Sequence, residues 1–389
     1  MKIVSIFVLF FLGFSTSAMA AWDLNDVSYL MPLPKVIGSD NLLRIKDEGS
    51  QGPLLPRQVL SVVPPLSPVM TSAEAEENLR VIAVRIDPCF PLPTPMACQK
   101  QIRFVWQPLE IGFRQQTSTV DAALHSFYIL TDAEFDELLL DLAAWKNKFS
   151  PQTQNLPLQI HPAWKAEGDQ SPAFIEFNSI VKKYAGTRKL TRVTSMVVRG
   201  AGDMWAFAGF AIKDNQLKLF MVPRLDRQSQ AFVNFAVPAD HFERGMISPQ
   251  PTGNDSFSKI TTNSDRYQVG ETTPEHEEVI LKELRAMHRI ENPHAFNPEN
   301  MDCVSCHVAL SGRSWIEKNR PDLGLQTIAD AFAYKNARYN LENKSTNVHN
   351  TQSLRAFGYF GNELAISQRV INESAAVADQ INQYVESLK

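Results

Sequence analysis

The feature that most constrains this chain of 389 residues is the pentapeptide Cys303-Val304-Ser305-Cys306-His307. It holds two of the four cysteines and one of the eight histidines within five residues. Side chains three or four residues apart lie on one face of a helix, so a helix here would point both thiols and the imidazole the same way. The pattern should arise by chance roughly once in a thousand chains of this composition. The segment therefore predicts a site that uses both sulfurs and the ring together.

This spacing, C-x-x-C-H, is the attachment motif of covalent haem, and at these positions the sequence resembles the c-type cytochromes. The resemblance implies that Cys303 and Cys306 form thioethers with the vinyl groups of one haem c. It also implies that His307 binds the iron as the proximal ligand. The resemblance covers residues 271 to 389, and for them it implies a small, mostly α-helical, cytochrome c-like domain.

The same thiol spacing has three other interpretations, namely a structural disulfide, a redox-active C-x-x-C and half of a zinc site. Zinc would need further thiol or imidazole ligands, and the sequence contains no second C-x-x-C. Thioredoxin-like motifs open a helix in a βαβ setting, which the neighbouring sequence does not suggest. Haem attachment is therefore the preferred interpretation.

Residues 1 to 20 have the pattern of a secretory signal peptide. Lys2 precedes an apolar run over residues 3 to 12, and residues 18 to 20 form a small-x-small cleavage site. The run is too short to remain as a bilayer-spanning anchor, and no other stretch is apolar and long enough. We expect a mature chain that starts at Ala21, contains no membrane span and resides in the periplasm, where haem c is normally attached.

The other two cysteines, Cys89 and Cys98, flank a Pro-rich segment between two strand-like runs, residues 81 to 86 and 102 to 106. An oxidising compartment permits these thiols to pair. A bridge at this place would fix a hairpin and contribute about 2–3 kcal/mol to stability. We therefore expect a structural disulfide rather than a metal or catalytic pair.

Length and composition indicate a globular protein of two or three domains, with 21% charged and 44% hydrophobic residues. The net charge of −4 gives no indication of a nucleic-acid partner. After the signal peptide we expect an irregular Pro-rich arm over residues 21 to 75. An α+β domain of unknown role is expected over residues 76 to 270, and a haem c-binding domain over 271 to 389. The polar, turn-rich stretch from 253 to 265 marks their boundary.

The central segment predicts an α+β fold with antiparallel strands, because no helical crossovers separate its later strand-like runs. These runs cover residues 122–130, 192–199, 204–213, 217–222 and 232–237. A helix is expected from Thr131, with Glu134 completing a capping box. Its buried face would consist of Phe135, Leu138, Leu139 and Leu142.

The histidines of this segment, His125, His161 and His241, have no neighbouring ligand pattern. A lone histidine is more often a hydrogen-bonded structural residue than a ligand. The sequence also contains no phosphate loop, nucleophile elbow or metalloprotease motif. We therefore interpret these histidines as structural, and the segment does not reveal a ligand.

Two helices are expected in the carboxyl-terminal part. One begins at Thr273-Pro274 and carries an apolar stripe of Ile280, Leu284 and Met287. The other is expected to be capped by Asn372. Its regular apolar face consists of Val377, Ile381, Tyr384, Val385 and Leu388.

The second axial ligand is an open question, because common monohaem cytochromes take it from a downstream methionine. Residues 308 to 389 contain no methionine. His294, in a Pro-bounded loop before the motif, and His349, in a polar loop after it, are the candidate distal ligands. The alternatives are an upstream methionine, Met287 or Met301, and an open position.

A haem also needs an apolar pocket and cations near its propionates. The candidates for the pocket are Phe296, Trp315, Phe332, Tyr334, Phe357 and Tyr359. The candidates for the cations are Arg313, Arg320 and Arg355. For each of these residues taken singly, an ordinary place in the core or on the surface is the more common role.

Together these features predict a periplasmic monohaem c-type cytochrome that transfers single electrons between unidentified redox partner proteins. An electron carrier is expected rather than a catalyst. The alternative that the sequence leaves open is a haem enzyme of the peroxidase kind, or a sensor of small ligands. In that case the α+β domain would bind a substrate or signal.

Overall fold

The computed structural model describes residues 21–63, 65–67, 70–91, 98–112, 115–199, 204–213, 216–223, 225, 227–233, 274–345, 354 and 356–387. Several sequence predictions lie outside these residues. They are the signal peptide, the boundary at 253–265, the cap at Thr273, His241, His349 and Arg355.

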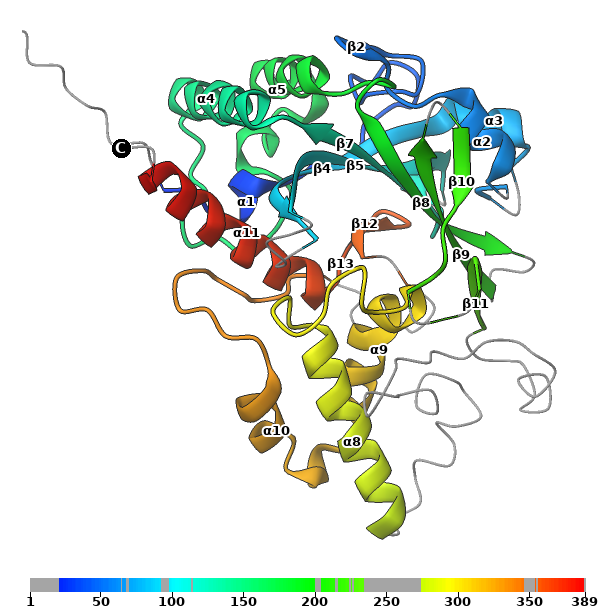
Figure 1. Ribbon diagram of the computed structural model, residues 1–389, viewed down its shortest axis with the longest axis vertical. Coiled ribbons are helices and arrows are strands. Elements are labelled where there is room, and N and C mark those ends of the chain that lie inside the picture. Colours follow the sequence, from blue (N-terminus) through cyan, green and yellow to red (C-terminus); the bar gives the residue numbers. More distant parts are fainter. Residues whose placement is uncertain are drawn as a thin grey trace, which may run out of the picture.

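The described chain is an α+β fold, as predicted, and its centre is one large antiparallel sheet (Figure 1). The strands of this sheet are β1 (Ser28–Leu30), β4 (Leu79–Phe90), β5 (Gln99–Ile111), β6 (Thr117–Thr119), β7 (Ala123–Leu130), β8 (Leu190–Arg199), β9 (Met204–Lys213), β10 (Gln216–Leu219) and β11 (Ser229–Val233). They follow the order β1, β4, β5, β7, β8, β9, β10, with β6 beside β5 and β11 beside β9. Neighbouring strands are antiparallel throughout, which confirms the pairing expected from the sequence.

Helices α4 (Asp132–Phe149) and α5 (Pro172–Tyr184) cover one face of the sheet (Figure 1). The predicted capping box starts α4, because the Thr131 amide donates to the Glu134 carboxylate at 2.8 Å and the Glu134 amide donates to the Thr131 hydroxyl at 3.3 Å. The four predicted core residues of this helix are all buried. They pack with aromatic side chains into the main hydrophobic core.

The segment expected as an irregular arm, residues 21 to 75, contributes many side chains to the main core where the structure describes it. Trp22, Leu24 and Val27 are at most 4% exposed, and helix α1 (Leu24–Val27) contacts the carboxyl-terminal helix. The prolines keep the rest of the segment in short pieces, since each removes a backbone donor. These pieces are the hairpin of β2 (Glu48–Gly49) and β3 (Gly52–Pro53), and the helices α2 (Arg57–Val62) and α3 (Ser72–Asn78).

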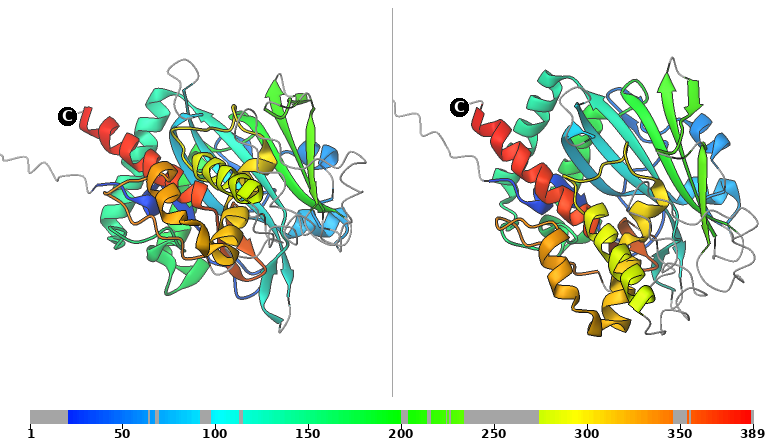
Figure 2. Two further views of the ribbon diagram at one scale, coloured as in Figure 1. Left: turned by 90° about the horizontal axis from the view of Figure 1, so that it is seen from below. Right: turned by 60° about the horizontal axis from the view of Figure 1, so that its bottom comes forward.

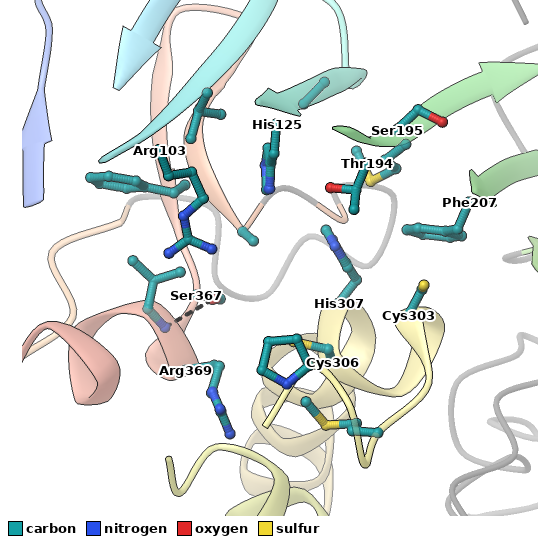
Figure 3. Close-up of a pocket in the computed structure, with 18 of the residues that line it drawn as sticks. Arg103, His125, Thr194, Ser195, Phe207, Cys303, Cys306, His307, Ser367 and Arg369 are labelled. Carbon is teal, nitrogen blue, oxygen red and sulfur yellow. Dashed lines mark hydrogen bonds between the residues drawn. The ribbon is translucent and has the colours of Figure 1, made fainter. Parts of the chain in front are cut away.

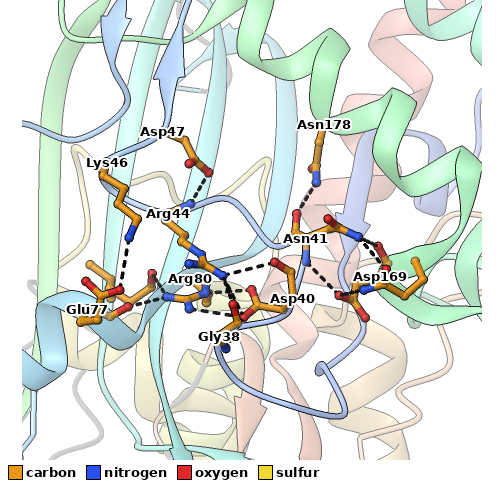
Figure 4. A network of polar contacts seen from close by, with 12 residues as sticks. Gly38, Asp40, Asn41, Arg44, Lys46, Asp47, Glu77, Arg80, Asp169 and Asn178 are labelled. Atoms are coloured by element: carbon orange, nitrogen blue, oxygen red, sulfur yellow. Dashed lines mark hydrogen bonds and ion pairs between the residues drawn. The ribbon is translucent and has the colours of Figure 1, made fainter.

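Polar contacts hold this segment to the rest of the protein (Figure 4). The buried Arg80 of β4 donates from Nε to the Asp40 carboxylate at 2.9 Å. The backbone amide of Asn41 donates to Asp169 at 2.9 Å, and the Asn178 side chain of α5 donates to the Asn41 carbonyl at 2.9 Å. The last two bonds satisfy the backbone amide and carbonyl of Asn41 in this irregular segment.

The carboxyl-terminal part lies on the other face of the sheet (Figures 1 and 2). It consists of α8 (Pro274–Ile290), α9 (Cys303–Asn319), α10 (Leu325–Phe332), the hairpin of β12 (Phe357–Phe360) and β13 (Glu363–Ile366), and α11 (Gln368–Ser387). Short 3₁₀ turns occur at Pro162–Trp164, Gly168–Gln170 and Pro321–Leu323. Helices α8 and α9 form a second hydrophobic cluster with Met196, Trp205, Phe207 and Phe232 of the sheet.

Helix α11 begins earlier than the sequence indicated. Asn372 lies inside the helix, where its amide donates to the Glu291 carbonyl at 2.9 Å instead of capping. The Ser367 hydroxyl accepts a bond from the Val370 amide at 3.3 Å at the helix start. Of the predicted apolar face, Val377, Ile381, Tyr384 and Val385 belong to the same core as the sheet, and Leu388 lies outside the described residues.

The predicted disulfide between Cys89 and Cys98 is present and joins the end of β4 to the start of β5, with the two Cα atoms 4.5 Å apart. Among the helices of the described residues, none combines the length and the apolar character needed to cross a membrane.

Candidate functional site

A cavity separates the sheet from the amino-terminal turn of α9, on the sheet face opposite α4 and α5 (Figure 3). Its space is about 1120 Å³, including the part that opens to solvent. Cys303, Cys306 and His307 line one wall, and strands β5, β7, β8 and β9 supply the other.

The start of α9 is fixed by two polar side chains. Asp302 caps the helix and accepts a bond from the Ser305 amide at 2.9 Å. Gln230 of β11 donates to Asp302 at 2.7 Å and accepts from the Val304 amide at 3.0 Å. Because the first turn is held from both sides, Cys303 faces the cavity in a defined direction.

The two motif thiols face the cavity and are not joined in a disulfide. Burial raises the pKa of Cys303 and of Cys306 to about 12 each, so both thiols are protonated at neutral pH. Redox-active and metal-binding cysteines need a lowered pKa, because the thiolate is the reactive form. In the described part of the chain, no three His, Cys, Asp or Glu side chains gather as a metal-binding group. The setting thus does not favour a thioredoxin-like site.

The imidazole of His307 is oriented by the backbone. Its Nδ1 lies 2.7 Å from the carbonyl oxygen of Leu354. A carbonyl only accepts, so Nδ1 carries the proton and Nε2 keeps a lone pair. Leu354 is itself held by Asp121, which accepts bonds from the Leu354 amide and from the Trp205 indole at 2.9 Å each. This is the arrangement that prepares a histidine to bind a metal through Nε2.

The opposite wall carries a second histidine, His125 of β7. The sheet register places Val105, His125 and Thr194 in one row across three strands. Figure 3 shows His125 and His307 pointing into the cavity from opposite sides. No ligand pattern surrounds His125 in the sequence, and its interpretation as a structural residue did not anticipate this position.

Arginines surround one side of the cavity. Arg103 and Arg192 form the row next to that of His125, with Phe127 between them. Arg369 of α11 completes the group and pairs with Glu373, its Nη2 lying 2.6 Å from the carboxylate. Two residues along a strand span about 7 Å, so the cationic row lies close to the histidine row.

Arg103 and Arg192 are incompletely neutralised. Burial lowers the pKa of both guanidinium groups, and the nearest Asp87 oxygen is 3.9 Å from Arg103. Among the described residues no carboxylate forms an ion pair with Arg192, and its buried Nε has no hydrogen-bond partner. The Phe220 ring lies 4.4 Å from its guanidinium carbon. A ligand that brings carboxylates would satisfy these groups, as haem propionates do.

The candidate distal ligands that the structure describes do not all lie at the cavity. His294 is exposed, its ring lies 5.5 Å from that of Tyr334, and it does not line the cavity. Its amide is held in a turn by the Asn292 side chain at 3.0 Å, which keeps the loop on the outside of the helices. This placement does not support His294 as a ligand. Met301 lines the cavity, whereas Met287 is buried in the helix cluster.

The other sequence candidates need correction as well. Of the six aromatic residues proposed for the pocket, Phe357 lines the cavity and the other five do not. Arg313 pairs with Glu291 and Glu317 at 2.8 Å, and Arg320 pairs with Asp322 at 2.8 Å. Local carboxylates thus engage the arginines of α9 and of the turn after it, and the cations of the cavity come from the sheet and α11.

Comparisons of the chain with protein-family models, with curated protein sequences and with solved structures found no match. The fold and the site therefore define the class of protein by themselves. It is an α+β protein in which a helix with a C-x-x-C-H motif faces a cationic cavity on an antiparallel sheet.

Proposed function

We propose that this protein binds one haem c covalently and acts as a periplasmic monohaem c-type cytochrome in one-electron transfer. The main support is the joint placement of Cys303, Cys306 and His307 on the wall of one cavity. The two thiols would hold the haem through thioethers, and Nε2 of His307 would bind the iron. When bound, the iron would supply a redox couple that exchanges one electron with a partner protein.

The rest of the cavity suits the same cofactor. Arg103 and Arg192 would bind the propionate carboxylates, and the buried Nε of Arg192 would thereby gain a hydrogen-bond partner. Phe207 and Phe357 supply apolar surface that excludes water. Burial of the group and the hydrogen bond on His307 are the two means by which these residues would set the reduction potential.

The cavity contains several side chains that can coordinate iron, and these favour electron transfer over catalysis. An electron carrier needs a redox group near the surface with both axial positions filled, whereas a haem enzyme or ligand sensor needs one open position. Besides His307, the lining includes His125, Met196 and Met301, which can each bind iron. These residues support a filled position.

The test is covalent haem on the exported protein. The full chain, with its amino-terminal segment, is produced in a bacterial host that matures c-type cytochromes, and haem is stained after denaturing electrophoresis. The protein should retain the stain and lose it when Cys303→Ala and Cys306→Ala are combined. The matched control combines Cys89→Ala and Cys98→Ala, which removes the disulfide and should leave the stain.

Two outcomes would overturn the proposal. One is an exported protein without covalent haem, in cells that attach haem to a reference cytochrome c. The other is undiminished stain in the Cys303 and Cys306 double variant. Export itself is checked by amino-terminal sequencing of the periplasmic fraction, which should begin at Ala21.

A further inference from the structure

His125 occupies the centre of the sheet wall that faces the proposed haem-binding helix. Strand β7 has β5 on one side and β8 on the other, so the position is fixed by two ladders of backbone hydrogen bonds. The side chain is half-buried and lines the cavity, and Figure 3 shows it directed at the space that His307 enters from α9. The ring is therefore both accessible to a ligand in the cavity and held by rigid backbone.

The neighbours of His125 leave room for its ring. Val105 and Thr194 are directly opposite it in the register, and Gly209 of β9 is next in the same row. A Cβ atom at Gly209 would lie 1.8 Å from the Phe220 ring, so the glycine permits that ring to lie against the strand. Of these four residues, His125 has the longest side chain.

The competing side chains are less well placed. Met301 is two residues before α9, on the same side of the cavity as His307, whereas two axial ligands must bind from opposite faces of a ring. Met196 is 3% exposed and packs in the hydrophobic cluster with Trp205 and Phe207. His125 combines a position on the opposite wall with a half-buried side chain, whereas Met196 and Met301 are 3% and 5% exposed.

We infer that His125 is the second axial ligand of the haem iron, an inference that rests on the proposed function. The sheet domain then completes the site, because strand β7 supplies a ligand and strands β5 and β8 supply the propionate cations Arg103 and Arg192. The iron is coordinated by two imidazoles, one from each wall, and is low-spin in both oxidation states.

The experiment replaces the ligand while the covalent attachment is kept. His125→Ala should still carry haem after denaturing electrophoresis, but its spectrum should change from low-spin to high-spin and its reduced form should bind carbon monoxide. Added imidazole should restore the low-spin spectrum, because it can occupy the space left by the side chain. His125→Met should instead produce the near-infrared charge-transfer band of methionine ligation.

The controls are Met301→Leu and single alanine replacements of the other six histidines besides His307, all of which should keep the bis-imidazole spectrum. If the His125 variants do not accumulate, the control variants identify the second ligand by elimination. A low-spin bis-imidazole spectrum that persists in every control leaves His125 as the histidine that supplies the second imidazole. An unchanged low-spin spectrum in His125→Ala would overturn the inference, as would a methionine band or rapid carbon monoxide binding in the unaltered protein. Absence of covalent haem from the unaltered protein would instead reject the proposed function itself.

Discussion

Glu373 of α11 accepts a hydrogen bond from Nη1 of Arg85 on β4 at 2.7 Å, although the two residues are 288 positions apart. The same carboxylate accepts a bond from Nε of Arg369 at 2.7 Å. Burial raises the pKa of Glu373, but Arg369, Arg85 and Arg103 outweigh that effect and hold the pKa well below its usual range. One carboxylate thus joins the last helix to the sheet and neutralises cations beside the cavity.

Replacing Glu373 with Gln should lower the free energy of unfolding by about 3 kcal/mol, because buried guanidinium groups lose their counter-charge. Urea denaturation measures the change. The matched control is Glu137→Gln, which breaks an exposed pair with Lys183 and should cost less than about 1 kcal/mol. Since the carboxyl pKa is lowered in the folded state, its stabilisation is present above pH 4.5, the ordinary pKa, and is lost as the pH falls below it. Equal effects of the two variants would contradict this role.

The second prediction concerns the docking of α11 on the sheet. Val377 is fully buried in the main core, and Val377→Ala should destabilise the protein by about 2 kcal/mol through lost burial and a residual cavity. Val62 on α2 is 49% exposed, so Val62→Ala should change the unfolding free energy by less than about 0.5 kcal/mol. Thermal unfolding of both variants gives the comparison. A Val377 variant as stable as the Val62 variant would show that α11 does not support the core.

Acid should destabilise the protein through His161, whose ring packs against those of Tyr29 and Trp164. Burial lowers the pKa of His161 to about 3, whereas the unfolded chain has the ordinary value of 6.5. Between these values the unfolded state binds one more proton than the folded state, so stability rises with pH by up to about 1.4 kcal/mol per pH unit. His161→Gln should reduce the slope of unfolding free energy against pH between 6 and 4. The exposed His294→Gln is the control, and equal slopes in all three proteins would refute this assignment.

Asp121 is expected to act on the reduction potential through Leu354 and His307. Asp121→Ala removes the acceptor that holds the Leu354 amide, which loosens the carbonyl at Nδ1 of His307. A less basic imidazole stabilises the oxidised iron less, so the potential should rise. A rise of up to about 60 mV corresponds to a tenfold change in relative affinity for the two states.

Spectroelectrochemical titration measures that potential. Asp121→Asn keeps an oxygen that can accept from both the Leu354 amide and the Trp205 indole, and it serves as the conservative control. A potential that is the same in the alanine variant as in the unaltered protein would show that the Leu354 carbonyl does not tune the site.

Features encoded by neighbouring residues could be predicted from the sequence. The capping box of Thr131 and Glu134, the disulfide between Cys89 and Cys98 and the helix that begins at Pro274 each depend on a few adjacent positions. Strand runs and their antiparallel pairing followed from short, closely spaced apolar segments. These parts of the fold are confirmed because the information is local.

The second wall of the cavity could not be predicted in the same way. His125 and Arg192 share it with Arg103 only through the register of three strands, and no local pattern encodes that register. Because side chains alternate between the two faces of a sheet, His125 and Phe127 of β7 lie on the same face. The alternation does not show which element covers that face. The burial of Trp22 likewise depends on contact with a helix near the other end of the chain.

The cavity takes one wall from β7 and the other from α9, which are widely separated along the chain. A coordinate bond from His125 to a group fixed on α9 would close a loop of roughly 180 residues. By the chain-entropy relation, a cross-link of that span restricts the unfolded ensemble by about 5 kcal/mol. Folding and redox state would then be thermodynamically linked, because any difference in the strength of that bond between oxidised and reduced iron must appear as an equal difference in unfolding free energy. The two redox forms of the protein should therefore unfold at different denaturant concentrations.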